Sequence, residues 1–202
     1  MGNGGNQWLS AQTTRFPSIE RGHAGDTDNQ AMRRNKVQTA KPRMTTPAQP
    51  VTLREITADT VVPVINLSVA GSQTHLVAPN AVSLAEALFN PEAWYRAIYL
   101  GETPVGFVML YDESLREVPP ASPTVGVWRF MVAEAYQRQG IGKAAMRQVI
   151  EHVRRKGIFN QLTLSYVPAD GSPEPFYRSI GFRNTDRVDH GERVMELPLG
   201  ED

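Results

Sequence analysis

The chain has 202 residues, of which 41% are hydrophobic, and its 21 basic and 21 acidic side chains give a formal net charge of zero. This length suits one domain, with or without a tail. The balanced charge argues against the strong positive field of a protein that binds nucleic acid or a membrane surface. Because no cysteine is present, disulfides, zinc sites with Cys ligands and a Cys nucleophile are excluded.

Composition also bounds the expected cofactors and location. The four histidines are scattered without the spacing of metal ligands, so we expect no metal. No apolar run approaches the roughly 20 residues of a membrane span, and the N-terminus lacks the apolar segment of a secretory signal. We therefore expect a cytoplasmic protein, which the lack of cysteine also fits.

Residues 1–50 differ in character from the rest of the chain. They are rich in Gly, Asn, Gln, Thr and Pro, carry more basic than acidic side chains and show no sustained apolar period. Such a stretch buries too little apolar surface to offset its ordering entropy, so a disordered tail is predicted. A mis-assigned start, with translation beginning at Met44, is an equal alternative. We expect a single domain over residues 51–199.

After this tail, strand-like and helix-like patterns alternate, which predicts the α/β class. A strand is expected at residues 51–56. A helix capped by Asp59 should follow and extend to Val69. A second helix should open at the capping-box spacing of Ser83 and Glu86.

The middle of the chain predicts strands. A β-hairpin is expected over residues 97–111, with its turn at 101–104, and a Pro-rich loop at 118–123. Residues 125–133 are apolar at nearly every position, which favours a strand buried on both faces.

A longer amphipathic helix is expected at residues 140–156. Its apolar residues recur every four positions, at Ile141, Ala145, Val149 and Val153, while basic residues face outward. Gly157 is well placed to end it. The remaining expected elements are a strand at 162–167, a short helix at 175–180 and a last strand at 193–197.

The segment that joins strand 125–133 to this helix has the properties of an anion site. The first amide groups of a helix lack internal partners, and the helix dipole favours anions there. Gly140 and Gly142 carry no side chain that would keep a phosphate from the backbone, and Arg138 and Lys143 add charge. The spacing is neither a Walker loop nor a dinucleotide motif. Taken alone, it fits an ordinary tight turn equally well.

A second motif, Phe176-Tyr177-x-x-x-Gly181-Phe182, follows farther along the chain. Together with Gln137-x-x-Gly140-x-Gly142, it resembles the GCN5-related N-acetyltransferase (GNAT) superfamily, as does the order of expected elements. This resemblance implies a mixed central sheet that splays around the cofactor and is flanked by helices. It also implies acetyl-CoA as co-substrate, direct transfer to an amine without a metal, and a homodimer as one common assembly.

The resemblance implies roles for individual residues. Tyr177 would protonate the departing thiolate, and Met131 and Val132 would pair with the pantetheine arm. The other residues expected to contact the cofactor are Gln137, Arg138, Gln139, Gly140, Ile141, Gly142, Lys143 and Phe176. The family often has Asn in the loop after the next strand, where residues 166–170 here read Tyr-Val-Pro-Ala-Asp. One side-chain contact to the cofactor arm is therefore in doubt.

Acyl transfer to an amine also needs a proton acceptor, because an alkylamine with a pKa of about 10.4 is almost fully protonated at pH 7. The candidates are Asp112, at the end of the hairpin strand, and Glu86, on the second helix. For each, an ordinary surface carboxylate is the alternative. Arg129 lies in an otherwise apolar strand, so it either pairs with a carboxylate or contacts the cofactor.

Within the superfamily, residues 73–86, 127–131 and 189–196 resemble the bacterial spermine/spermidine (diamine) acetyltransferases. The resemblance implies a polyamine acceptor such as spermidine or spermine. The alternatives are another amine, namely an amino acid, an aminoglycoside or a protein N-terminus, and a non-catalytic module that binds acyl-CoA.

Overall fold

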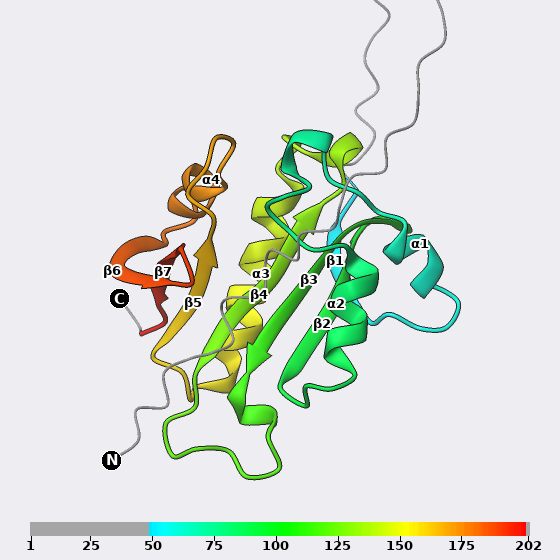
Figure 1. The fold of residues 1–202 in the computed structure, drawn as a ribbon. Helices are drawn as coiled ribbons and strands as arrows, with labels where there is room; N and C mark the ends of the chain where they lie inside the picture. Colours follow the sequence, from blue (N-terminus) through cyan, green and yellow to red (C-terminus); the bar gives the residue numbers. More distant parts are fainter. Residues whose placement is uncertain (1–48, 201–202) are drawn as a thin grey trace, which may run out of the picture. The chain divides into compact units, whose positions relative to one another are not determined.

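The computed structural model describes residues 49–200 (Figure 1). Almost all of the predicted tail, including Met44, lies outside the described residues, and the domain boundaries 51–199 stay a prediction. No helix within the described part of the chain combines the length and the apolar character needed to cross a membrane.

A seven-stranded mixed sheet forms the framework of the described residues, in the order β1-β2-β3-β4-β5-β7-β6. Its one parallel pair among the described strands joins β4 and β5, and every other pair is antiparallel. The predicted mixed α/β architecture is confirmed. The strands are β1 (Val51–Arg54), β2 (Ala93–Leu100), β3 (Thr103–Asp112), β4 (Val125–Val132), β5 (Gln161–Tyr166), β6 (Arg183–Asp189) and β7 (Glu192–Pro198).

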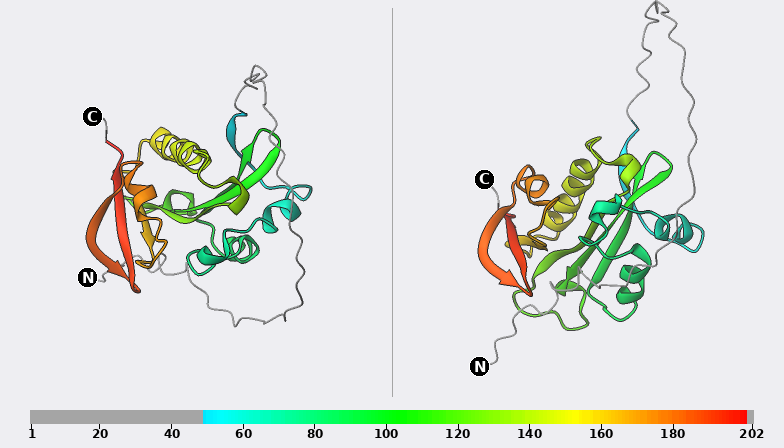
Figure 2. Two further views of the ribbon diagram at one scale, coloured as in Figure 1. Left: turned by 90° about the horizontal axis from the view of Figure 1, so that it is seen from above. Right: turned by 45° about the horizontal axis from the view of Figure 1, so that its top comes forward.

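Helices cover both faces of this sheet. Figure 2 shows α3 on one face and α1 and α2 on the other. Each face has its own hydrophobic cluster, one of which includes the buried residues of α3. The α-helices are α1 (Val61–Ile65), α2 (Asn80–Ala87), α3 (Ile141–Lys156) and α4 (Glu174–Arg178), and short 3-10 turns span Gly71–Gln73, Glu113–Leu115 and Glu134–Tyr136.

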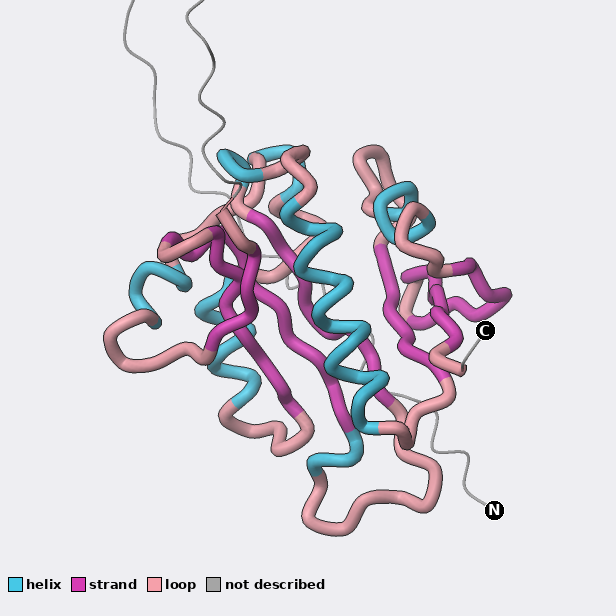
Figure 3. The backbone as a smooth tube through the Cα atoms, turned by 180° about the vertical axis from the view of Figure 1, so that it is seen from behind, coloured by secondary structure: helices cyan, strands magenta, loops and turns pink. Residues whose placement is uncertain are grey.

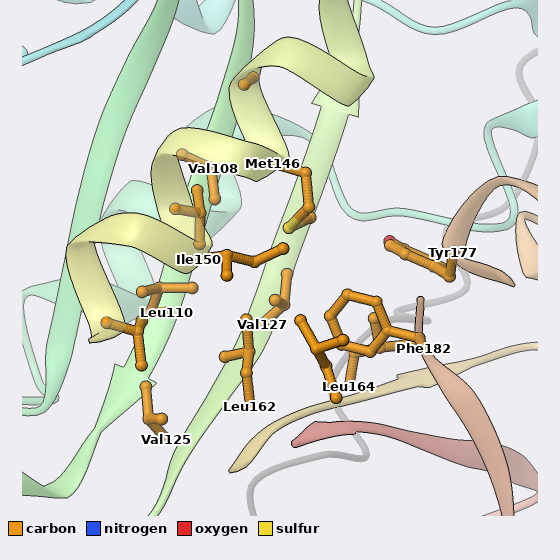
Figure 4. Close-up of a cluster of buried hydrophobic side chains, with 14 of the residues drawn as sticks. Val108, Leu110, Val125, Val127, Met146, Ile150, Leu162, Leu164, Tyr177 and Phe182 are labelled. Carbon is orange, nitrogen blue, oxygen red and sulfur yellow. The ribbon is translucent and has the colours of Figure 1, made fainter. Parts of the chain in front are cut away.

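The amphipathic pattern of α3 has the predicted effect. The four apolar residues of the predicted stripe are all buried, together with Met146 and Ile150. The helix lies along the sheet in Figure 3, and Figure 4 shows Met146 and Ile150 beside Val127 and Leu164. Gly157 ends the helix with a φ of 66°, a left-handed conformation that glycine adopts without the Cβ clash of other residues.

Two predicted helix starts are wrong. The helix α1 begins at Val61 after Thr60 rather than at Asp59, and it ends at Ile65, well before Val69. The helix α2 begins at Asn80, so Ser83 lies inside it and is no cap. The reason is tertiary, because the buried Asn80 side chain donates a 2.8 Å hydrogen bond to the Val64 carbonyl and ties the start of α2 to α1.

One strand was not predicted. The strand β6 reads Arg-Asn-Thr-Asp-Arg-Val-Asp and has no buried residue, so its sequence lacks the apolar alternation of a half-buried strand. It forms because it pairs with β7 across a two-residue turn at His190 and Gly191, which have φ values of 48° and 88°.

The sheet opens between its two central strands. The strands β4 and β5 pair only at Gly126 with Thr163 and at Val127 with Leu164. Beyond these pairs, β4 continues to pair with β3, and β5 continues to pair with β7. The β3–β4 register also shifts between Met109 and Leu110, which leaves Trp128 as an extra, bulged residue. The predicted splay is therefore present, and we call it the fork.

The core beside the fork yields a test of stability. Leu162 is fully buried in the cluster under α3, whereas Leu88 is 79% exposed. We expect Leu162→Ala to lower the free energy of unfolding by about 2–5 kcal/mol, because it leaves a cavity among residues that cannot fully collapse. Leu88→Ala should change it by about 0.5 kcal/mol or less. Urea unfolding of both variants measures the difference, and equal effects would contradict this assignment of the core.

Candidate active site

The loop between β4 and α3 presents backbone amides at the wide end of the fork. The first intrahelical hydrogen bond of α3 runs from the Ala144 amide to the Gly140 carbonyl, at 3.0 Å. The amides of Ile141, Gly142 and Lys143 precede it, which is the arrangement that binds anions at a helix start. Gly140 has a φ of 81° and Arg138 a φ of 59°, so the loop bends sharply toward the helix.

Gln137 and Gln139 hold this loop in shape. The Gln137 side-chain amide donates to the Val132 carbonyl at 2.9 Å and to the Gln73 side chain at 2.8 Å. The Gln139 amide donates to the Ala135 carbonyl at 3.0 Å. These contacts tie the loop to the end of β4 and to the turn before α2. The structure therefore gives both glutamines a role in positioning the loop.

The two glycines of the loop serve different purposes. At Gly140 the left-handed backbone favours glycine, and an added Cβ would meet nothing within 4 Å. At Gly142 an added Cβ would lie 3.3 Å from the Phe176 ring. Phe176 in turn stacks on Phe130, with ring centroids 5.7 Å apart. Gly142 thus lets α4 pack closely against the first turn of α3.

A basic groove of about 370 Å³ runs beside the loop, between α3 and the segment after α4. Its cations are Lys143, Arg147 and Arg154, against one carboxylate, so its charge suits a phosphate-bearing ligand. Lys143 also donates to the Ser179 carbonyl at 3.0 Å, which links the two walls. The residues that line it are Lys143, Arg147, Ile150, Glu151, Arg154, Ser179, Ile180 and Leu197.

Tyr177 projects from α4 with its ring in the core. The ring packs edge-on against Phe176 and Phe182, with centroids 5.1 and 5.8 Å away, and the residue is 6% exposed. In Figure 4 its hydroxyl points toward α3. Burial raises the pKa of Tyr177 well above its usual value, because the phenolate loses solvation. The side chain is therefore a protonated donor at neutral pH.

The Glu174 carboxylate fixes the position of α4 and therefore of Tyr177. Glu174 accepts hydrogen bonds from Tyr166 at 2.7 Å, from Arg178 at 2.7 Å and from Asn184 at 2.9 Å. These bonds lower the pKa of Glu174 to about 2, because each stabilises the ionised form. Tyr166 stands at the end of β5, so the contacts join α4 to the sheet beside the fork.

Met131 and Val132 lie on β4 beyond its last pair with β5. Met131 is 5% exposed and faces α2, where the Asn80 amide lies 3.7 Å from its sulfur. Val132 packs against the opposite cluster. Within the described residues, this stretch of β4 pairs with β3 on one side and has no ladder to β5 on the other. An extended ligand could therefore lie along that edge.

Arg129 pairs with a carboxylate, one of the two alternatives that the sequence left open. Its side chain is fully buried, and it donates to Glu86 at 2.9 Å and to the Trp128 carbonyl at 2.9 Å. Burial lowers the pKa of Arg129, whereas the charges of Glu86 and Glu192 raise it. Protonating Glu86 would break this ion pair, which makes Glu86 an unfavourable proton acceptor.

Asp112 lies away from the loop and Tyr177. It is 1% exposed, forms an ion pair with Lys156 and accepts hydrogen bonds from the amide and hydroxyl of Ser114. Its register partner is Val125, at the opposite end of β4 from the phosphate loop. The structure does not bring Asp112 to the fork, and Lys156 already occupies its carboxylate.

Two polar residues at the fork were not predicted as site residues. Glu192 is 4% exposed, and the Ser165 hydroxyl donates to it at 2.5 Å. Ser165 lies on β5 and Glu192 on β7, so their hydrogen bond joins residues that are 27 positions apart in the sequence. The one available signal was the His190-Gly191 pair, which resembles a two-residue hairpin turn and would have placed Glu192 at a strand start.

The profile of the acetyltransferase (GNAT) family matches residues 70–182, more than half of the chain. The chain belongs to the acetyltransferase (GNAT) family. This GNAT protein is therefore an N-acetyltransferase. It is 26% identical over 159 residues to the spermine/spermidine N(1)-acetyltransferase of Bacillus subtilis (strain 168), an alignment that covers 74% of this chain and 99% of the relative.

Solved structures show the same fold. A putative GNAT-family acetyltransferase from Desulfovibrio desulfuricans superposes with a TM-score of 0.57 and 16% identity, over 74% of this GNAT chain and 99% of that one. A GNAT-family acetyltransferase from Elizabethkingia anophelis with acetyl-CoA bound gives a TM-score of 0.53 and 18% identity, over 73% and 97%. At these identities the likeness shows the fold alone.

The contact between Gly142 and Phe176 can be tested by adding one methyl group. We expect Gly142→Ala to lower the free energy of unfolding by about 1–3 kcal/mol, because the new Cβ overpacks the junction of α3 and α4. Gly71→Ala is the control, since an added Cβ there meets nothing within 4 Å. Thermal unfolding measures both, and a neutral Gly142→Ala would show that Phe176 moves aside without cost.

Proposed function

We propose that this enzyme transfers an acetyl group from acetyl-CoA directly to a primary amine, and that the acceptor is a polyamine such as spermidine or spermine. The observation that carries the proposal is the arrangement at the fork. Helix-start amides lie at its wide end, and the protonated Tyr177 side chain stands beside it. Along it lies the part of β4 that, within the described residues, has no ladder to β5.

Each part of acetyl-CoA has a counterpart in this arrangement. The pyrophosphate would accept hydrogen bonds from the amides of 141–143, with Arg138 and Lys143 adding charge. The pantetheine arm would lie along β4 at Met131 and Val132, beside the Phe176 ring. The basic groove next to Lys143 would hold the phosphorylated adenosine end.

The chemistry needs no covalent enzyme intermediate. The neutral amine attacks the thioester carbonyl, and the C–S bond breaks as the amide forms. The leaving thiolate is a weaker base than a phenolate, because a thiol has an ordinary pKa of about 8.5 by analogy with Cys and a phenol one of about 10. Transfer of the Tyr177 proton to the thiolate is therefore coupled to cleavage of the C–S bond, which drives it. Tyr177 then regains its proton from solvent. Positioning of the amine against the thioester should contribute most of the rate.

Two observations support a polyamine. The relative from Bacillus subtilis is named for spermine and spermidine. Three carboxylates also gather at the fork, namely Glu86, Asp189 and Glu192, and they outnumber the Arg129 charge between them. A cationic acceptor would be attracted to such a site. A cytoplasmic location and a homodimer stay predictions.

Coenzyme A release, followed with a thiol reagent, tests the proposal. Spermidine and spermine should stimulate release more than an aminoglycoside, free amino acids or a peptide. Tyr177→Phe should lower kcat by about 10²–10⁴-fold, the usual loss for a general acid. Tyr99→Phe is the matched control, because Tyr99 is equally buried at 6% exposure but lies on β2. Release with another amine alone would discard the polyamine, and no release with any amine would contradict the transfer.

The groove makes a separate prediction about the nucleotide. Arg147→Ala should raise the KM for acetyl-CoA several-fold, corresponding to about 1 kcal/mol, because it removes a charge from the phosphate site. It should leave the KM for acetyl-dephospho-CoA nearly unchanged, since that molecule lacks the 3′-phosphate. Arg155→Ala, on the same helix but outside the groove, serves as the control. Equal effects on both substrates would place the 3′-phosphate elsewhere.

A further inference from the structure

A buried polar cluster lies at the narrow end of the fork, on the face opposite α3. Side chains alternate between the faces of a strand, and Leu162 and Leu164 of β5 point into the core under α3. Ser165 therefore points to the other face, one residue past the last pair with β4. Arg129 lies two residues past that pair on β4 and joins the same cluster.

Contacts order the cluster on each side of the fork, and the charge of Arg129 acts across it. On one side, Glu192 at the start of β7 accepts the Ser165 hydroxyl hydrogen bond at 2.5 Å. On the other side, Arg129 holds Glu86 of α2 at 2.9 Å. The Arg129 charge also stabilises the ionised form of Glu192. Arg129 thus stands between two carboxylates, one from each side of the opening.

The surroundings of Glu192 act on its pKa in opposite directions. Burial raises the pKa of Glu192, and so does the nearby Asp189 of β6. The Ser165 hydrogen bond, Arg129 of β4 and His190 of the β6–β7 turn lower it. The net shift is upward from the ordinary carboxyl value. A carboxylate with raised proton affinity that still has charged partners is suited to take up a proton and release it.

We propose that Glu192 is the general base of the transfer. This inference rests on the proposed function and names the residue that the sequence left unidentified. As the amine nitrogen attacks the thioester carbonyl, one N–H proton passes to a Glu192 oxygen. The C–S bond then breaks, and the thiolate takes the Tyr177 proton. Glu192 then returns its proton to solvent, and Tyr177 regains one from solvent. Counted with the proton that the ammonium releases before the attack, ammonium and acetyl-CoA yield the amide, coenzyme A and one proton.

The position of Glu192 distinguishes it from the earlier candidates. Glu86 is held by the Arg129 ion pair, and Asp112 is held by Lys156 far along β4. Glu192 accepts a hydrogen bond from the neutral hydroxyl of Ser165. This hydroxyl can reverse its role and remain bonded when the Glu192 carboxyl is protonated. Protonation at Glu192 therefore leaves the Arg129–Glu86 ion pair intact.

The test compares Glu192→Gln with Glu196→Gln, a carboxylate four residues along the same face of β7. Glu192→Gln should lower kcat by about 10²–10⁴-fold, as expected for loss of a general base. The affinity for coenzyme A, measured by calorimetry, should not change. Glu196→Gln should match the wild type. Glu192→Asp, which keeps the charge but withdraws it by one methylene, should retain an intermediate kcat and a normal melting temperature.

The pH dependence supplies a readout that a structural role would not change. Glu192 must be ionised to accept a proton, so wild-type kcat should fall as the pH drops through the raised pKa of Glu192. This acid limb should be absent in Glu192→Gln.

A Glu192→Gln enzyme with wild-type kcat and an unchanged acid limb would overturn the assignment of Glu192 as the base and leave the proposed acetyl transfer intact. If the wild type releases no thiol with any amine, acetyl transfer itself is wrong and the base assignment falls with it.

Discussion

The site depends on the short parallel ladder between β4 and β5, which is only two residue pairs long. Beyond Val127 and Leu164, each strand keeps its other partner, so the sheet divides without unravelling. The bulge at Trp128 adds a residue to β4 at the point where the strands part, and bulges increase local twist. The phosphate loop, Tyr177 and the polar cluster all take their positions from this opening.

The opening separates two kinds of chemistry on the two faces of the sheet. Toward α3 lie the helix-start amides, the basic groove and the Tyr177 ring, which suit an anionic cofactor and a departing thiolate. Toward α2 lie Glu86, Arg129 and Glu192, which suit a cation. A buried guanidinium without partners would cost several kcal/mol, so the carboxylates around Arg129 are a condition of its burial. Burial and the charges around it together set the proton affinity of Glu192.

Local signals in the sequence predicted much of this arrangement, and contacts between distant residues explain what it missed. The four-residue apolar period of α3 and the glycine after it gave the helix its correct face and end, because both effects act within one element. The prediction that α2 starts at Ser83 was wrong because the Asn80 side chain bonds to the Val64 carbonyl, and the capping-box motif does not include Val64. The sequence offered Asp112 as a candidate base because its partner Lys156 lies 44 residues away along the chain. Glu192 was missed because its partner Ser165 lies on another strand.

The narrowness of the β4–β5 ladder also has a mechanical consequence. The strands β5, β6 and β7 share only two residue pairs with the other strands of the sheet, at the β4–β5 ladder. Side chains packed under α3, the stacked rings of Phe130 and Phe176 and the Lys143–Ser179 hydrogen bond add to this connection. Among the strand pairs of the described sheet, β4 and β5 share the fewest residue pairs, and separation along this line would expose amides on both sides to exchange with solvent. A ligand that contacts both sides of the opening stabilises the closed sheet, because its binding free energy is lost when the two sides separate. Binding of a ligand in the fork and the rigidity of the sheet are thus coupled, because the β4–β5 ladder is only two residue pairs long.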